Sequence, residues 1–143
     1  MLFTRVLVPV DFSSASLEAL RLAVSVGLRE GARLTIMTVD TEPWSKDSDA
    51  ELQALRRWAV AELPSSLHVD FLVERGSPAD RINAQAISGE HDLVVMGTHG
   101  KTGLERVMLG SVAETVVRTC AVPVMVTHDR SASSVPEGER HEP

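Results

Sequence analysis

The chain alternates between short apolar runs and segments in which apolar residues recur at helical spacing, and this alternation is the strongest constraint on its fold. The apolar runs lie at residues 5–10, 34–39, 69–73, 93–96 and 123–126. In the first segment between them, Leu20, Ala23, Val24, Gly27 and Leu28 fall on one helical face. Three further helical segments are predicted at 48–63, 77–88 and 111–119. The alternation predicts an α/β fold with a five-stranded parallel sheet and four helices, and continuous apolar strands indicate helices on both sheet faces.

Several residues are typical of helix ends. Gly31 follows the first helix, where glycine often ends a helix. Ser77 followed by Pro78 is typical of a helix start. Ser48 and Glu51 have the spacing of a capping box, which predicts the start of the second helix.

Length and composition predict a single domain followed by a tail. A chain of 143 residues is long enough to bury roughly 68–70% of its unfolded surface. Beyond His128 the sequence becomes polar and poor in aliphatic residues. We therefore predict one three-layer domain over residues 1–128 and a mobile C-terminal tail over residues 129–143.

Charge and composition argue against several classes of partner. The net charge of −6 gives no basic footprint for nucleic acid. No apolar run approaches the length of a membrane-spanning helix. The single cysteine, Cys120, has apolar neighbours and is interpreted as a small buried hydrophobe rather than a metal ligand. The N-terminus lacks the features of a signal peptide, so we expect a cytoplasmic protein with no nucleic-acid or membrane partner.

The stretch MGTHGKTGLERVMLGS at 96–111 contains the last three letters of a phosphate-binding P-loop. A P-loop needs glycine five positions before Gly100, and Val95 stands there instead. The dinucleotide fingerprint also fails, because Gly97, Gly100 and Gly103 are spaced by threes. Neither familiar phosphate loop is therefore present.

A different spacing does hold, in which Gly97, Gly100 and Gly110 are followed by Ser111. Glycines after a strand let the backbone approach a ligand, and the N-terminus of a helix favours a phosphate. Each glycine alone is better explained by a turn or a cap. Together, after the fourth strand and at the start of the fourth helix, they predict a phosphate site, with Lys101 and Arg106 as mobile cations beside it.

The same residues carry a resemblance to a known family. VLVPVDFS at 6–13, VVMGTHGKTGLERVMLGSVAE at 94–114 and VPVMV at 122–126 resemble the universal stress protein family over Arg5 to Thr127. The pattern G-x2-G-x9-G-S is typical of its ATP-binding branch. The resemblance implies a Rossmann-like sheet of the adenine-nucleotide alpha-hydrolase type, with strand order 3-2-1-4-5.

The resemblance also implies which residues hold the nucleotide. The end of the first strand would hold the nucleoside, the end of the second would pack on adenine, and the fourth strand with its loop and helix would face the ribose and phosphates. These residues are Pro9, Val10, Asp11, Val39 with Asp40 as a further candidate, Met96, Gly97, His99, Gly100, Gly110, Ser111 and Val112. Asp11 has an alternative interpretation as a helix cap or turn former.

Three loop residues have alternative roles. His99 has no histidine or carboxylate at a fixed short spacing to orient it, so we interpret it as a loop histidine rather than a general base. For Lys101 and Arg106 we expect either a contact with phosphate or a position facing solvent.

The family usually forms homodimers through its last strand. In the order 3-2-1-4-5 that strand is a sheet edge, and an apolar edge invites pairing with another chain. Its residues are Val122, Val124, Met125 and Val126, and Pro123 is tolerated at an edge. We predict antiparallel pairing of two such strands across a two-fold axis.

Three functions remain as hypotheses. The first is a homodimeric ATP-binding sensor that regulates a stress response, with ADP or AMP as other ligands of the same site. The second is a slow ATPase that uses magnesium. The third is a dimeric scaffold without nucleotide. The sequence shows no clear acidic pair for magnesium and no nucleophile with a base, which favours the sensor.

Overall fold

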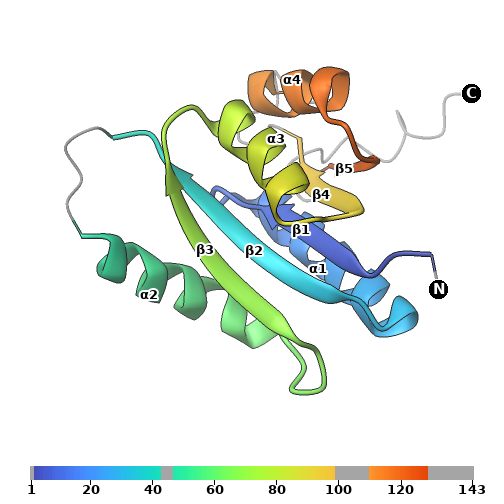
Figure 1. Cartoon of the computed structure of the whole chain (residues 1–143). Coiled ribbons are helices and arrows are strands. Elements are labelled where there is room, and N and C mark those ends of the chain that lie inside the picture. The colour runs from blue at the N-terminus through green and yellow to red at the C-terminus, as the bar shows by residue number, and fades with distance from the viewer. Residues whose placement is uncertain (1, 43–46, 99–109, 129–143) are drawn as a thin grey trace, which may run out of the picture.

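The computed structural model describes residues 2–42, 47–98 and 110–128. In chain order its elements are β1 (Arg5–Pro9), α1 (Ser14–Glu30), β2 (Arg33–Asp40), α2 (Ser48–Ala59), a 3-10 turn (Val60–Glu62), β3 (Val69–Arg75), α3 (Pro78–Ser88), β4 (Leu93–Gly97), α4 (Ser111–Thr119) and β5 (Val124–Thr127) (Figure 1). The predicted alternation of strands and helices is confirmed. Strand ends differ from the predictions by one or two residues, and the second helix gives way to the 3-10 turn before Pro64.

The five strands form one sheet in the order β3-β2-β1-β4-β5, and every neighbouring pair is parallel. This is the order that the resemblance implied. Because the strands are parallel, all their carboxyl ends lie at one edge of the sheet. The chain winds outward from β1 in both directions, so the winding reverses between β1 and β4, where ligands of open α/β sheets usually bind.

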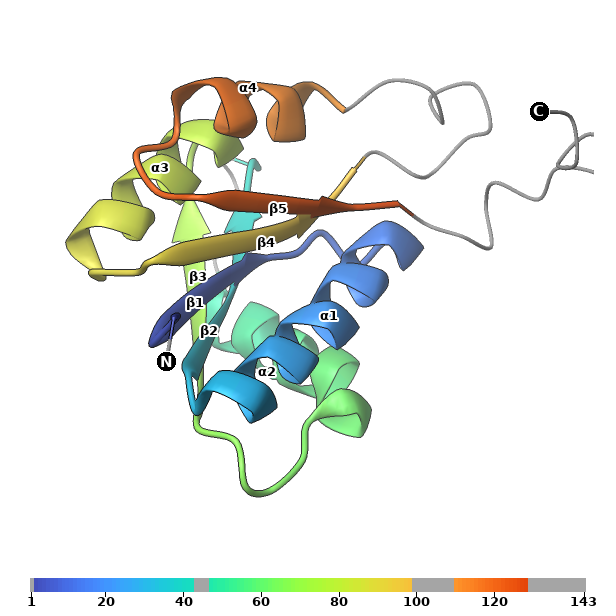
Figure 2. The ribbon, with the colours of Figure 1, turned by 90° about the vertical axis from the view of Figure 1, so that its right-hand side faces the viewer.

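Helices cover both faces of the sheet and make three layers. Figure 2 shows α1 and α2 on one side of the strands and α3 and α4 on the other. The central strand serves both layers, because its successive side chains point to opposite faces. Val6 and Val8 pack with α1 and α2, whereas Leu7 between them packs with α3 and α4, and all three are fully buried.

The helix ends confirm some sequence signals and correct others. Gly31 ends α1 with a φ of 68°, a left-handed conformation that suits glycine. The capping box predicted from Ser48 and Glu51 is wrong. Asp47 caps α2, its Oδ1 accepting from the Ala50 amide at 2.9 Å, and this leaves the side chains of Ser48 and Glu51 to another partner.

The described ranges carry no helix that is long and apolar enough to cross a membrane. The predicted tail at 129–143 lies outside the described residues, so the domain boundary at 128 stays a prediction.

His91 is a buried titratable group just before β4, at the end of the sheet where the strands begin. Only 5% of its surface is exposed, and its amide donates to the Ala86 carbonyl at 3.0 Å. Burial lowers the pKa of the His91 ring below its ordinary value, and the positive charge of Arg5 lowers it further. The folded protein therefore favours the neutral ring.

We expect the free energy of unfolding to fall as the pH is lowered through 6.5, the ordinary pKa of histidine, toward the lower folded-state pKa of His91. The folded-state pKa of His91 lies below the ordinary value of 6.5, so the unfolded chain takes up the proton first and gains stability relative to the folded chain. One such group contributes at most about 1.4 kcal/mol per pH unit. Urea unfolding across this range measures the slope, and a His91→Gln variant should show a smaller one. An equal slope in the variant would contradict the assignment.

Candidate functional site

A cavity opens at the carboxyl edge of the sheet, at the point where the winding reverses. Its volume is about 410 Å³, within the range of small-molecule sites, roughly 300–1,000 Å³. The described residues that line it are Pro9, Val10, Asp11, Ser13, Ser16, Met37, Val39, Thr41, Pro78, Ile82, Met96, Gly97, Thr98, Gly110, Ser111, Val112 and Ala113. They come from three strands, three helices and the segments that join them.

One end of the cavity is the N-terminus of α4. Gly110 is the N-cap residue, in an extended conformation with φ −65° and ψ 160°, and it has no side chain to cap the helix. The first amides of a helix have no acceptor inside the helix and carry the positive end of its dipole. The amides of Ser111, Val112 and Ala113 therefore suit an anion.

The other walls of the cavity are largely apolar. Met37 and Val39 come from β2, Met96 comes from β4, and Ile82 comes from α3. Met37 and Ile82 are buried in the core layer under α3 and α4. β1 lies between β2 and β4 in the sheet, so its carboxyl end lies beside both of their ends. The cavity thus suits a ligand with a flat apolar part and an anionic part.

Asp11 also lines the cavity, and it shapes the turn into α1. Its Oδ1 accepts from the Ser16 hydroxyl at 2.7 Å and from the Ser13 amide at 3.1 Å. Ser13, not Asp11, caps α1 by accepting from the Ser16 amide at 3.1 Å. Phe12 between them has a φ of 67°, which is rare for a bulky residue. Asp11 therefore forms the turn and also lines the cavity, and its contact with a nucleotide stays a prediction.

Gly97 lies where the sequence predicted it, but the space around it gives glycine a different reason. A Cβ built on Gly97 would lie 2.5 Å from the backbone of Ala15 at the start of α1. The glycine thus lets α1 pack closely against the end of β4. Close helix–strand packing is sufficient to require glycine here, whether or not a ligand approaches.

The structure brings together nine of the residues predicted for the site. Pro9, Val10, Asp11, Val39, Met96, Gly97, Gly110, Ser111 and Val112 all line the one cavity. The predictions for His99, Gly100, Lys101 and Arg106 fall outside the described residues. Asp40 is not among the lining residues, and its carboxylate binds Arg75.

Sequence reasoning missed other lining residues. Met37 could have been found, because it lies two residues before Val39 and shares its face of the strand. Pro78 and Ile82 could not, since only the folded arrangement brings α3 to this cavity.

The cavity offers little to a metal ion or to acid–base chemistry. Asp11 is the one carboxylate among its described lining residues. Over residues 2–42, 47–98 and 110–128, no group of three His, Cys, Asp or Glu side chains could hold a metal.

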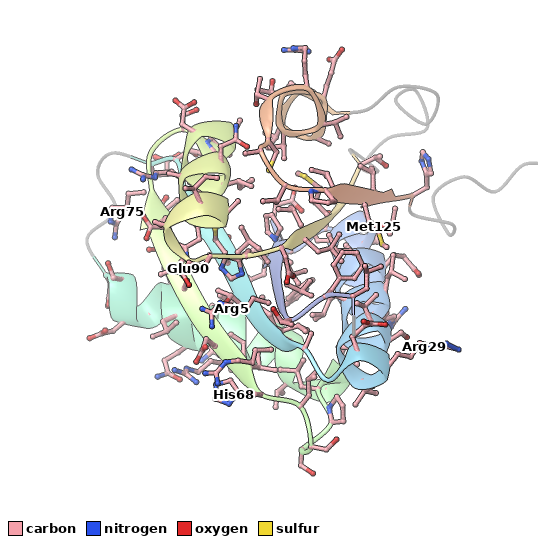
Figure 3. All side chains as sticks on the ribbon, turned by 45° about the vertical axis from the view of Figure 1, so that its right-hand side comes forward. Arg5, Arg29, His68, Arg75, Glu90 and Met125 are labelled. Carbon is pink, nitrogen blue, oxygen red and sulfur yellow. The ribbon has the colours of Figure 1, made fainter. Side chains whose placement is uncertain are left out.

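The predicted dimer strand lies at the edge of the sheet. β5 pairs with β4 alone, and Met125 is 36% exposed. In Figure 3, Met125 lies on β5 and Arg75 on β3, at opposite edges of the sheet. The edge strand is joined to the cavity, because the Thr98 amide donates to the Thr127 carbonyl at 2.8 Å and Thr98 lines the cavity.

This arrangement of fold and cavity agrees with the family that the sequence resembles. The family model described as the Universal stress protein family matches residues 2–128. The chain belongs to this family. The resemblance drawn from the sequence is thereby confirmed.

The chain is also similar to known universal stress proteins in sequence and in structure. A universal stress protein of Methanocaldococcus jannaschii is 33% identical over 142 residues, covering 87% of this chain and 82% of that protein. A crystal structure of a universal stress protein in complex with cAMP has a TM-score of 0.71 at 26% identity, covering 90% of this chain and 99% of that one. The Archaeoglobus fulgidus universal stress protein in complex with dAMP has a TM-score of 0.69 and covers 89% and 99%, but at 24% identity it supports the fold alone.

In this universal stress protein, we expect Gly97→Ala to lower the free energy of unfolding by about 1–3 kcal/mol, because the added methyl group overlaps the backbone of α1. Urea unfolding followed by circular dichroism measures the change. Ser111→Ala, an exposed position on the same cavity, is the control and should leave stability nearly unchanged. Equal unfolding midpoints for Gly97→Ala and the unsubstituted chain would show that α1 does not need this close approach.

Proposed function

We propose that this chain binds an adenine nucleotide in the cavity at the carboxyl edge and acts as a nucleotide-dependent regulator. ATP is the proposed ligand, and ADP and AMP can occupy the same place. One observation carries the proposal: a single cavity joins the uncapped start of α4 to an apolar wall. A nucleotide has the matching shape, with charged phosphates at one end and a flat base at the other.

The cavity gives the ligand a direction. Phosphates would lie at the amides that follow Gly110, and the base would lie against Val39, Met96 and Ile82. The end of β1 would then face the ribose, with Asp11 beside it. The solved relative with cAMP, at 26% identity, supports an adenine nucleotide as the class of ligand.

A regulator is a better proposal than an efficient enzyme. Phosphoryl transfer needs a positioned nucleophile and strong charge stabilisation, often by magnesium. Among the described lining residues, the one carboxylate is Asp11, and its Oδ1 already accepts two hydrogen bonds. A regulator needs only that the nucleotide binds one state of the protein better than another. We propose that it does so in the cytoplasm during a stress response.

The first test is to identify what the protein holds. The purified, dialysed protein is denatured, and released nucleotide is identified by chromatography and mass. Fresh protein is then incubated with ATP and magnesium, and ADP is followed over hours. Bound ATP without turnover supports the regulator. Turnover that requires the site supports the slow ATPase, and no binding at all supports the scaffold.

We expect Gly110→Val to abolish ATP binding, a loss of at least about 100-fold in affinity, because its side chain would stand where phosphate approaches the amides of α4. The backbone at Gly110 is extended, a conformation that a β-branched residue also adopts, although the position is buried. Isothermal titration with ATP measures the affinity, and circular dichroism checks the fold. Unchanged affinity in a folded variant would show that phosphate does not bind at this helix.

We also propose that two copies pair through β5 as a homodimer. Met125 is exposed on this edge, and Val124 and Val126 flank it. Val122 lies just before the strand and packs on the core layer under α3 and α4 together with Val124.

Met125→Lys should convert this dimer to a monomer, because the substitution places a charge on the exposed edge of each copy. Light scattering coupled to gel filtration measures the mass of the particle. Val117→Lys, at an exposed apolar position on α4, is the matched control and should remain a dimer. A dimer that survives Met125→Lys would exclude pairing through this strand.

A further inference from the structure

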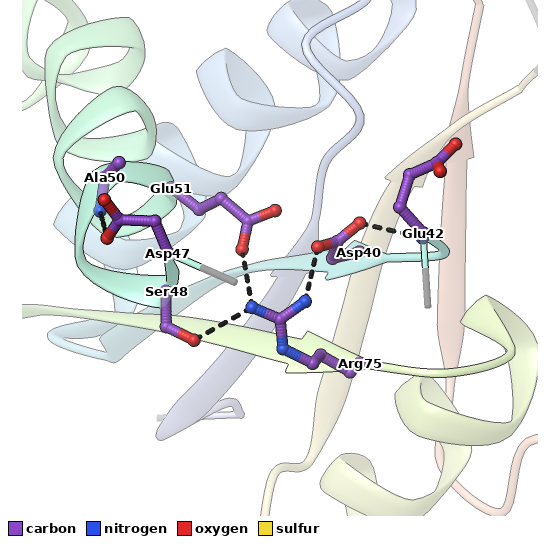
Figure 4. Close-up of polar contacts among 7 residues, drawn as sticks. All are labelled: Asp40, Glu42, Asp47, Ser48, Ala50, Glu51 and Arg75. Carbon is purple, nitrogen blue, oxygen red and sulfur yellow. Dashed lines mark hydrogen bonds and ion pairs between the residues drawn. The ribbon is translucent and has the colours of Figure 1, made fainter. Parts of the chain in front are cut away.

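Arg75 joins the ends of two strands to the start of a helix (Figure 4). It is the last residue of β3. One guanidinium nitrogen donates to Asp40 Oδ2 at 2.6 Å. The other donates to the Ser48 hydroxyl at 3.0 Å and to Glu51 Oε1 at 3.4 Å. One side chain thus binds the end of β2 and the first turn of α2.

The bond to Asp40 is set apart from ordinary surface ion pairs. Only 8% of the Asp40 side chain is exposed, against 38% for Arg75. A charge-assisted hydrogen bond in a partly buried place is stronger than an exposed pair, which contributes little. The fork of the guanidinium also fixes direction, because it can donate to acceptors on separate elements at once.

Asp40 in turn fixes the backbone around it. Its Oδ1 accepts from the Glu42 amide at 2.9 Å, and its carbonyl accepts from the Gly76 amide at 3.1 Å. The chain from 40 to 42 is therefore held in one turn. Thr41 lies inside this turn and Val39 lies directly before it, and both line the cavity. Neither Asp40 nor Arg75 lines it.

We propose that Arg75 is a positioning residue for the base side of the site. By holding Asp40 and the first turn of α2, it fixes the wall formed by Val39 and Thr41 against which the base packs. Arg75 does not touch the ligand and acts through Asp40. This inference rests on the proposed function, and it adds which contact shapes the base side of the cavity.

The test compares ligands that carry a base with one that does not. Arg75→Ala should weaken adenosine and ATP by the same factor, about tenfold, since both use the base wall. Inorganic tripolyphosphate, measured by displacement of ATP, should keep its affinity because it reaches only the start of α4. A general loss of structure would weaken all three ligands. Titrations are made at a temperature where circular dichroism shows each variant to be folded.

Arg29→Ala is the matched control. Arg29 is an exposed arginine in the last turn of α1, so its removal changes the net charge equally without touching this cluster. Its affinities should equal those of the unsubstituted chain. If Arg75→Ala does not fold, Arg75→Lys is measured instead. Lysine keeps the charge but not the fork, and the expected loss for adenosine is about threefold.

A double-mutant cycle tests whether Arg75 acts through Asp40. In an Asp40→Asn background, Arg75→Ala should cost less affinity for adenosine than it does alone, because the shared contact is already weakened. If the loss of adenosine affinity in the double variant equals the product of the losses in the two single variants, the inference is overturned.

The outcomes separate this inference from the proposed function. If the unsubstituted chain binds neither adenosine nor ATP, the proposed function fails and this inference with it. If it binds both and Arg75→Ala binds adenosine equally well, the inference alone is overturned.

Discussion

The structure depends on β1 lying at the centre of a parallel sheet. Its backbone pairs with β2 on one side and β4 on the other. Val6, Leu7 and Val8 are fully buried, and their side chains point alternately to the two faces of the sheet. A charged residue at any of these three positions would face a core of close-packed side chains. Since β1 is central, its carboxyl end is also the place from which the chain winds both ways. The same strand therefore builds both core layers and locates the site.

The position of the site follows from the parallel strands, because the helices that come after them can begin at the same end of the sheet. Each strand ends at the same edge, and the helices after β1 and β4 begin there. Their starts differ in a way that matters. Ser13 caps α1 with its own side chain, whereas α4 begins at Gly110 without one. One helix start is thus occupied by the protein itself, and the other leaves its amides facing the cavity.

The sequence predicted most of the fold because its signals are local. The signals used were apolar runs, helical spacing and the helix-ending Gly31, and each acts within a few residues. The strand ends could be assigned to the site because ligands of open α/β sheets bind where the winding reverses. Gly97 was placed correctly, but its close contact with Ala15 joins elements far apart in the chain. Arg75 was missed for the same reason, since its bond to Asp40 spans 35 residues. Ser48 and Glu51 misled because their spacing fits a local cap, while Asp47 holds that place.

The proposed regulation needs a physical link between the nucleotide and a surface that another chain contacts. β4 supplies one. Gly97 pairs with Thr127 of β5, and the Thr98 amide donates to the Thr127 carbonyl. Gly97 and Thr98 line the cavity, so we propose that a ligand bound there acts on the edge strand through the end of β4. On the far side of the cavity, Arg75 fixes the wall at β2. The proposed regulator would use this link, because the wall of the cavity at β4 is hydrogen-bonded to an exposed edge strand whereas the wall at β2 is held by Arg75.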